Sequence, residues 1–179
     1  MVTRDHHALA RALTQKLNIS KWKKAAFALG NIEPDYNRIS YMGHRREYFS
    51  NGHSYQCRKK WIFTFMEKPY RNTLLWWYRA GKAFHYMADS FSRPHNSEFG
   101  YSSGEHVKYE KELHEIFKRS LKGNPWKIPR VEPDFRSWLE TRHLRYLART
   151  RGIQDDCFYI FTTVEAAWEW LVETKLPQP

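Results

Sequence analysis

The sequence has few of the residues that hold small secreted or metal-stapled domains together. Only two cysteines occur among its 179 residues, Cys57 and Cys157. They form no metal-type CxxC pair and are too few for a disulfide framework. We therefore expect two unpaired thiols, with a single long-range disulfide as the alternative.

Long apolar runs are missing as well. The first residues, MVTRDHHALARAL, lack the apolar stretch of a signal peptide, and no segment approaches the roughly 18 apolar residues of a membrane span. The sequence thus predicts a soluble protein, and we expect a cytoplasmic location.

Acidic residues are scarce relative to basic ones, 19 against 30, which gives a formal net charge of +11. This charge favours polyanionic partners such as nucleic acid, anionic lipid surfaces or phosphorylated small molecules, without choosing among them. A solvated basic surface is the simpler interpretation of any single basic cluster.

The sequence also lacks repeats and low-complexity tracts, and its length suits one domain, residues 1–179.

Aromatic residues, by contrast, are abundant at 17%, and the apolar positions follow a helical period. Gly30 is expected to end the second helix, residues 31–51 to form a loop, and Asp5 and Ser103 to cap two helices. Only the segment CFYIF at 157–161 looks like a strand. We expect an all-α, single-domain multi-helix bundle, with a motif-bearing part at about 6–121 and a C-terminal helical extension at about 134–175. The predicted helices are 6–17, 21–29, 53–66, 72–91, 103–121, 134–150 and 163–174.

Two pairs of ionisable residues share one spacing. His85 and Asp89 are four residues apart on the predicted central helix, so both side chains lie on one face. His106 and Glu110 repeat this spacing on the next predicted helix, and His95 follows the proline that ends the central helix. Zinc accepts histidine nitrogen and carboxylate oxygen in this way. The five residues therefore predict a metal site.

A single histidine on an apolar helix is more often a hydrogen-bonded core residue than a ligand. Three features favour the metal hypothesis here. Asp89 lies on a helix too apolar to leave a carboxylate without a partner. The second pair has the same spacing, and the predicted loop offers Asp35 and His53 as further candidates. A di-iron bundle would need repeated Glu-x-x-His pairs, and only Glu140 and His143 fit, so that site is set aside.

The order His-x3-Asp-x5-His followed by His-x3-Glu resembles the bacterial zinc-dependent phospholipase C family, which is all-helical and holds three zinc ions. The segments GNIEPDYN, GHSYQ and HYMADSFSRPHN are similar to a small branch of that family. The resemblance extends from about His6 to Glu110.

The resemblance implies a role for each matching residue. His85 and Asp89 would hold the first zinc with a loop histidine, either His53, which the family pattern favours, or His44. Asp89 would bridge to a second zinc held by His6, with His7 as the alternative. Asp35 would act as general base or orient the attacking water. The third zinc would be held by His95, His106 and Glu110.

In the secreted members the mature chain begins with a tryptophan whose amino group and carbonyl bind zinc, whereas this sequence begins Met-Val-Thr-Arg. We also expect no counterpart of the family's membrane-docking module. The resemblance implies a zinc-dependent phosphodiester hydrolase with two or three ions and a phosphate-ester substrate, such as a phospholipid head group. The alternatives are a single-strand nuclease of the related fold, which the positive charge favours, and a non-catalytic basic binding protein with a structural metal site.

Overall fold

The computed structural model describes residues 1–37, 54–123, 126–132 and 134–177. Over these residues the chain forms seven α-helices, two short 3₁₀ helices and no strand, which confirms the predicted all-α class. The α-helices are α1 (Thr3–Gln15), α2 (Lys21–Tyr36), α3 (Tyr55–Met66), α4 (Leu74–Asp89), α5 (Ser103–Ser120), α6 (Phe135–Arg149) and α7 (Ile153–Lys175), and the 3₁₀ helices are η2 (Arg93–His95) and η3 (Ser97–Phe99).

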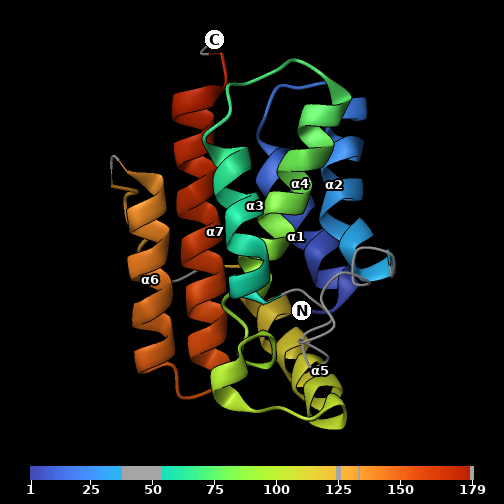
Figure 1. Ribbon diagram of the computed structural model, residues 1–179. Helices are drawn as coiled ribbons and strands as arrows, with labels where there is room; N and C mark the ends of the chain where they lie inside the picture. Colours follow the sequence, from blue (N-terminus) through green and yellow to red (C-terminus); the bar gives the residue numbers. More distant parts are fainter. Residues whose placement is uncertain (38–53, 124–125, 133, 178–179) are drawn as a thin grey trace.

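Helix α4 is the centre of the bundle and packs against α2, α3 and α7. Figure 1 shows α6 and α7 side by side at one edge, and α2 at the opposite edge. Because α4 is enclosed, its last turns are buried on nearly every side, including His85 and Asp89. The first residue of the chain lies near α5, so the end of α4, the start of α1 and α5 meet in one region (Figure 1).

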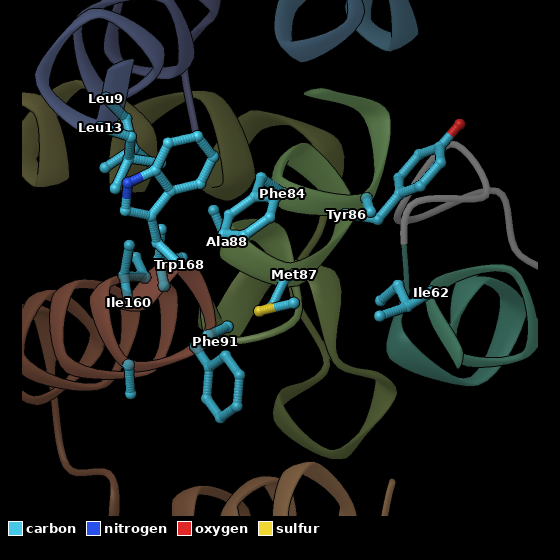
Figure 2. Close-up of a cluster of buried hydrophobic side chains, with 14 of the residues drawn as sticks. Leu9, Leu13, Ile62, Phe84, Tyr86, Met87, Ala88, Phe91, Ile160 and Trp168 are labelled. Carbon is cyan, nitrogen blue, oxygen red and sulfur yellow. The ribbon is translucent and has the colours of Figure 1, made fainter. Parts of the chain in front are cut away.

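The hydrophobic core extends from this region between α4 and α7. Aromatic rings supply much of it, as the sequence predicts: Phe27 packs on Phe84 and Trp168, with ring centroids 5.7 and 5.1 Å apart. Large rings bury much apolar area per residue, so a chain of this length builds a substantial core. Figure 2 shows side chains of this cluster, among them Leu9, Leu13, Ile62, Phe84, Met87, Phe91, Ile160 and Trp168.

The predicted end of the second helix at Gly30 is wrong. Helix α2 continues through Gly30 and Pro34 to Tyr36, so residues 31–36 are helical rather than loop. Glycine has no Cβ, and at position 30 this allows close backbone contact with α4: an added Cβ would lie 1.9 Å from the Tyr78 carbonyl oxygen. Packing against α4 therefore outweighs the low helix propensity of glycine.

The predicted strand at 157–161 is also wrong, because these residues lie inside α7. Cys157, Ile160, Phe161 and Val164 are all buried, which is the i, i+3, i+4, i+7 pattern of a helix face. The β-branched and aromatic residues of this segment suggest a strand, but its buried positions recur with the period of a helix.

Two helix caps also differ from the prediction. Ser102 rather than Ser103 caps α5, in a reciprocal capping box with Glu105. Asp5 lies inside α1, whose N-cap is Val2. Cys57 and Cys157 form no disulfide with each other, as expected. Within the described ranges, none of the helices has the length and apolar character needed to span a membrane.

Candidate metal centre

Six of the predicted site residues converge from four elements, with Asp35 as a seventh at the end of α2. His6 comes from α1, His85 and Asp89 from the last two turns of α4, His95 from η2, and His106 and Glu110 from α5. The i, i+4 spacing places both members of each helical pair inward, with Nε2–carboxylate distances of 3.1 Å in the His85–Asp89 pair and 3.2 Å in the His106–Glu110 pair.

The first group consists of His6, Asp35 and His85, each of which offers a ligand atom within 4.8 Å of the others. The rings of His6 and His85 stack with centroids 3.9 Å apart. Asp35 Oδ1 lies 3.7 Å from His85 Nε2, while its other oxygen, Oδ2, accepts a hydrogen bond from the Thr3 hydroxyl at 2.7 Å. One oxygen of Asp35 thus faces the site and the other is held by α1.

The second group consists of His95, His106 and Glu110. Both imidazole Nε2 atoms approach the same oxygen, Glu110 Oε1, at 3.3 and 3.2 Å. Asp89 lies between the two groups. Its Oδ1 is 3.1 Å from His6 Nε2 and 3.8 Å from His95 Nε2, and its Oδ2 is 3.1 Å from His85 Nε2.

The amino group of Met1 lies in the same space. It is 2.8 Å from Asp89 Oδ1, 2.9 Å from Glu110 Oε1 and 3.4 Å from His95 Nε2. Burial alone would lower the pKa of this amine, but the two carboxylates outweigh it and raise the pKa to about 12. A positive charge between Asp89 and Glu110 is therefore strongly favoured by the surrounding side chains.

The hydrogen bonds of His85 test whether the residues fit a metal ion. Its Nδ1 lies 2.8 Å from the backbone oxygen of Asn31, and because a carbonyl only accepts, Nδ1 must donate. In neutral His85, Nε2 then carries a lone pair, and it faces a second acceptor, the Asp89 carboxylate, at 3.1 Å. His85 Nε2 and the Asp89 carboxylate are thus two acceptors that face each other in a buried site, which is how two ligands of one cation are arranged.

The electrostatics agree with this interpretation. Burial and the neighbouring His6 lower the pKa of His85, and burial lowers the pKa of His95 to about 4, so both rings are neutral near pH 7. Burial by itself would raise the pKa of Asp89, but His95, the Met1 amine and His6 hold it well below its usual range. Neutral imidazoles and ionised carboxylates are the protonation states that bind zinc. The donor set therefore fits zinc.

Close packing of α2 on α4 positions His85. A Cβ added to Gly81 would lie 2.1 Å from the Phe27 carbonyl oxygen, and one added to Gly30 would clash with the backbone of α4 in the same way. Because neither glycine carries a side chain, the two backbones touch, and the Asn31 carbonyl reaches His85 Nδ1. The side-chain amide of Asn31 also donates a hydrogen bond to the backbone carbonyl of Gly81 at 3.1 Å. This bond fixes the register of α2 against α4.

Helix α6 holds the turn that carries His95. His143 Nε2 donates to the Ser90 carbonyl at 3.1 Å and to Asn96 Oδ1 at 2.9 Å. Asn96 in turn donates to the carbonyls of Ser90 and Ser92, at 3.1 and 2.9 Å. His143 thus braces the segment 90–96 from outside the set of candidate ligands.

Helix α7 holds the same turn through Asp156. This buried carboxylate accepts the Arg93 backbone N–H at 2.7 Å, two residues before His95. Burial raises the pKa of Asp156 to about 6, in spite of the donors around it. The other three donors are the hydroxyls of Tyr109, Tyr146 and Thr150.

The structure places the remaining candidates as follows. His6 is fully buried and faces the cluster, whereas His7 is exposed, which favours His6 of the two alternatives. His44 and His53 lie outside the described residues. Sequence reasoning misses the supporting roles of Asn31, His143 and Asp156. Only His143 carries a signal, its Glu-x-x-His spacing, and that spacing points to a di-iron ligand rather than to a brace.

Replacing His143 by Gln should reduce the loss of unfolding free energy that the protein shows as the pH falls. The folded pKa of His143 is lowered to about 4 by burial, whereas in the unfolded chain it is near its ordinary ~6.5. Stability from this group is fully present above pH ~6.5 and is lost as the pH falls toward 4. Between pH ~6.5 and ~5 this loss amounts to about 2 kcal/mol.

The measurement is urea unfolding of both proteins at pH 7 and pH 5 in chelator. Asp156, whose pKa is raised, changes stability in the opposite direction, but both proteins contain it, so their difference isolates His143. An unchanged pH dependence in His143→Gln would contradict the burial of a neutral ring at this position.

Fold and cluster together define an all-α protein with a candidate centre of histidine and carboxylate ligands. The chain matches the family described as zinc dependent phospholipase C over residues 5–159, and it belongs to this family. Comparison with curated proteins and with solved structures gave no match. The matched range includes α6 and the start of α7, and so includes both His143 and Asp156.

Proposed function

We propose that the chain is a zinc-dependent phosphodiesterase that hydrolyses the head-group ester of a phospholipid. The family is zinc-dependent and points to a hydrolase of the phosphodiesterase type. The observation that carries the finer proposal is the position of Asp89 between two groups of ligand atoms, with one oxygen toward His6 and the other toward His85. A carboxylate in this position suits a bridging ligand of adjacent ions.

In this proposal the ions number two or three. His85 and Asp89 would hold the first ion together with His53 or His44, and His6 and Asp89 would hold the second. His95, His106 and Glu110 would hold the third. When bound, zinc supplies Lewis-acid stabilisation of phosphate oxygens and a source of hydroxide near neutral pH.

The protein's own residues supply the proton transfer. Asp35 Oδ1 faces the site while Thr3 holds Oδ2, so this carboxylate is oriented to take the proton of the attacking water. The water oxygen bonds to phosphorus, the bond from phosphorus to the leaving alcohol breaks, and the proton passes from Asp35 to that alcohol. Asn31 keeps His85 in the tautomer that presents Nε2 inward.

A second candidate is a single-strand nuclease, which the net charge of +11 favours. A phosphodiester in DNA presents the same reacting group, so the cluster serves either substrate. Hydrolysis of single-stranded DNA but not of a phospholipid head-group ester would select the nuclease.

Metal analysis tests the proposal most directly. Purified protein should carry two or three equivalents of zinc and hydrolyse a chromogenic phosphodiester. Less than one equivalent, with no gain on adding zinc, would rule out the cluster as a zinc centre. Full zinc content without turnover on any phosphodiester would instead support the non-catalytic alternative.

His6→Ala should release one equivalent of zinc and leave the others in place. His6 is the described histidine assigned to the second ion, and metal affinity depends on the number of deprotonated ligands. His7→Ala is the matched control, because His7 is the adjacent residue on α1 but is exposed. Zinc is counted by elemental analysis after brief exposure to a chelator; an equal loss in both variants would show that His6 is not a ligand.

A further inference from the structure

Helix α2 carries an apolar stripe on its outer face. Trp22, Leu29 and Tyr36 are 65%, 55% and 72% exposed, and they are spaced by seven residues. Ala25 is exposed and Ile32 half-buried at the intermediate positions. Residues with this alternating spacing of three and four share one face of a helix, and the stripe is about 21 Å long.

This stripe is separate from the core-facing side of the helix. The buried residues of α2 include Phe27, Gly30 and Asn31, which contact α4. Seven large hydrophobic residues of the described chain are more than half exposed, and three of them lie on this one face. Scattered exposed apolar residues need no explanation, but an aligned set of this kind marks an interaction surface.

Positive charge surrounds the stripe at its N-terminal end. Lys21 and Lys23 flank Trp22, and the ammonium of Lys21 lies 5.4 Å from the centroid of the Trp22 ring. Glu33, which adjoins Ile32 in the stripe, is paired with Lys82 at 2.8 Å, so its charge is compensated. The surface is therefore apolar and basic.

The stripe ends at the candidate metal centre. Tyr36, its last residue, directly follows Asp35, whose carboxylate faces His85. We propose that the outer face of α2 docks on an anionic phospholipid surface, with Trp22, Leu29 and Tyr36 in the interfacial layer. The purpose of this docking, which is to bring lipid head groups to the metal centre, rests on the proposed function. The docking itself does not require catalysis.

A second copy of the chain fits this face less well. Pairing of α2 with α2 would bring together two chains that each carry a net charge of +11. Tryptophan and tyrosine prefer the boundary between water and lipid, and a basic amphipathic helix binds anionic lipids through apolar area and charge together. Charge and composition both favour the lipid surface.

The test is co-sedimentation of the purified chain, residues 1–179, with vesicles, after its zinc content has been measured. Wild type should bind vesicles of phosphatidylcholine mixed with phosphatidylserine more tightly than vesicles of phosphatidylcholine alone. Trp22→Ser/Leu29→Ser should weaken binding to the mixed vesicles by about tenfold or more. Lys21→Glu/Lys23→Glu should weaken it as well and remove its dependence on salt.

The matched control is Leu144→Ser. Leu144 is 67% exposed on α6, on the opposite side of the bundle from α2 (Figure 1), and its replacement should leave vesicle binding unchanged. All variants should keep the wild-type thermal unfolding and the wild-type hydrolysis of a soluble chromogenic phosphodiester, because none of the changed residues belongs to the centre.

The outcomes separate this proposal from the proposed function. Vesicle binding that depends on the stripe, by a protein that carries no zinc and has no turnover, would support the docking surface and contradict the proposed enzymatic function. Turnover without vesicle binding, or equal binding by wild type and Trp22→Ser/Leu29→Ser, would overturn the surface alone. A dimer in solution that the same double substitution dissociates, with no vesicle binding, would overturn the lipid surface and assign the stripe to a second copy.

Discussion

Asp89→Asn should lose more zinc than any other single substitution in the cluster. Asp89 lies within 4 Å of the Nε2 atoms of His6, His85 and His95, so one carboxylate contacts both groups of ligand atoms. Asparagine has the same shape but no negative charge, and its amide nitrogen cannot bind zinc. We expect zinc affinity and phosphodiester turnover to fall by more than about a hundredfold, beyond the effect of supporting residues around metal sites.

Asp35→Asn is the matched comparison. In the proposed function Asp35 acts on water, so this variant should keep its zinc and lose turnover. Elemental analysis and a chromogenic phosphodiester assay are made on both variants at the same pH. Loss of zinc from Asp35→Asn would instead make Asp35 a ligand, which its distance from His6 and His85 would permit. Zinc retained by Asp89→Asn would exclude the bridging role.

The second large effect is expected from Gly81→Ala. The added methyl group would lie 2.1 Å from the Phe27 carbonyl oxygen and 2.8 Å from the Asn31 backbone nitrogen. Backbone atoms of a packed helix cannot move aside as a flexible side chain can, so α2 and α4 must separate. We expect a loss of about 3 kcal/mol or more in unfolding free energy, measured by urea denaturation in chelator.

Gly104→Ala provides the control for this substitution. Gly104 lies in the first turn of α5, and an added Cβ would meet nothing within 4 Å. Its replacement should be neutral or stabilise by about 0.5 kcal/mol, because alanine restricts the unfolded chain and favours helix. Similar stabilities of Gly81→Ala and Gly104→Ala would contradict the direct backbone contact between α2 and α4.

Much of the fold can be predicted because helix periodicity is a local property. The nearly continuous apolar residues around His85 predict the central helix, and the structure confirms it. The errors have a shared cause, since the sequence does not show what a residue contacts. Gly30 has the composition of a helix stop, but it is a contact point for α4, and the residues of CFYIF face a helical core.

The candidate ligands can be predicted because their spacing reflects the geometry of a helix. The i, i+4 pairs His85–Asp89 and His106–Glu110 need no tertiary information. The choice between His6 and His7 does need it, since adjacent residues of a helix point about 100° apart and only the packing of α1 decides which is buried. The bonds from His143 and Asp156 connect residues about 50 and 60 positions apart, and no local pattern predicts such contacts.

The hydrogen bonds from His143 of α6 and Asp156 of α7 determine how far the chain can be shortened. A fragment that ends after α5 would contain every described candidate ligand, from His6 to Glu110. It would also leave the segment 90–96 without the bonds from His143 and Asp156, so His95 would lose its fixed position. The candidate ligands end at residue 110, but the shortest piece that keeps their arrangement extends into α7.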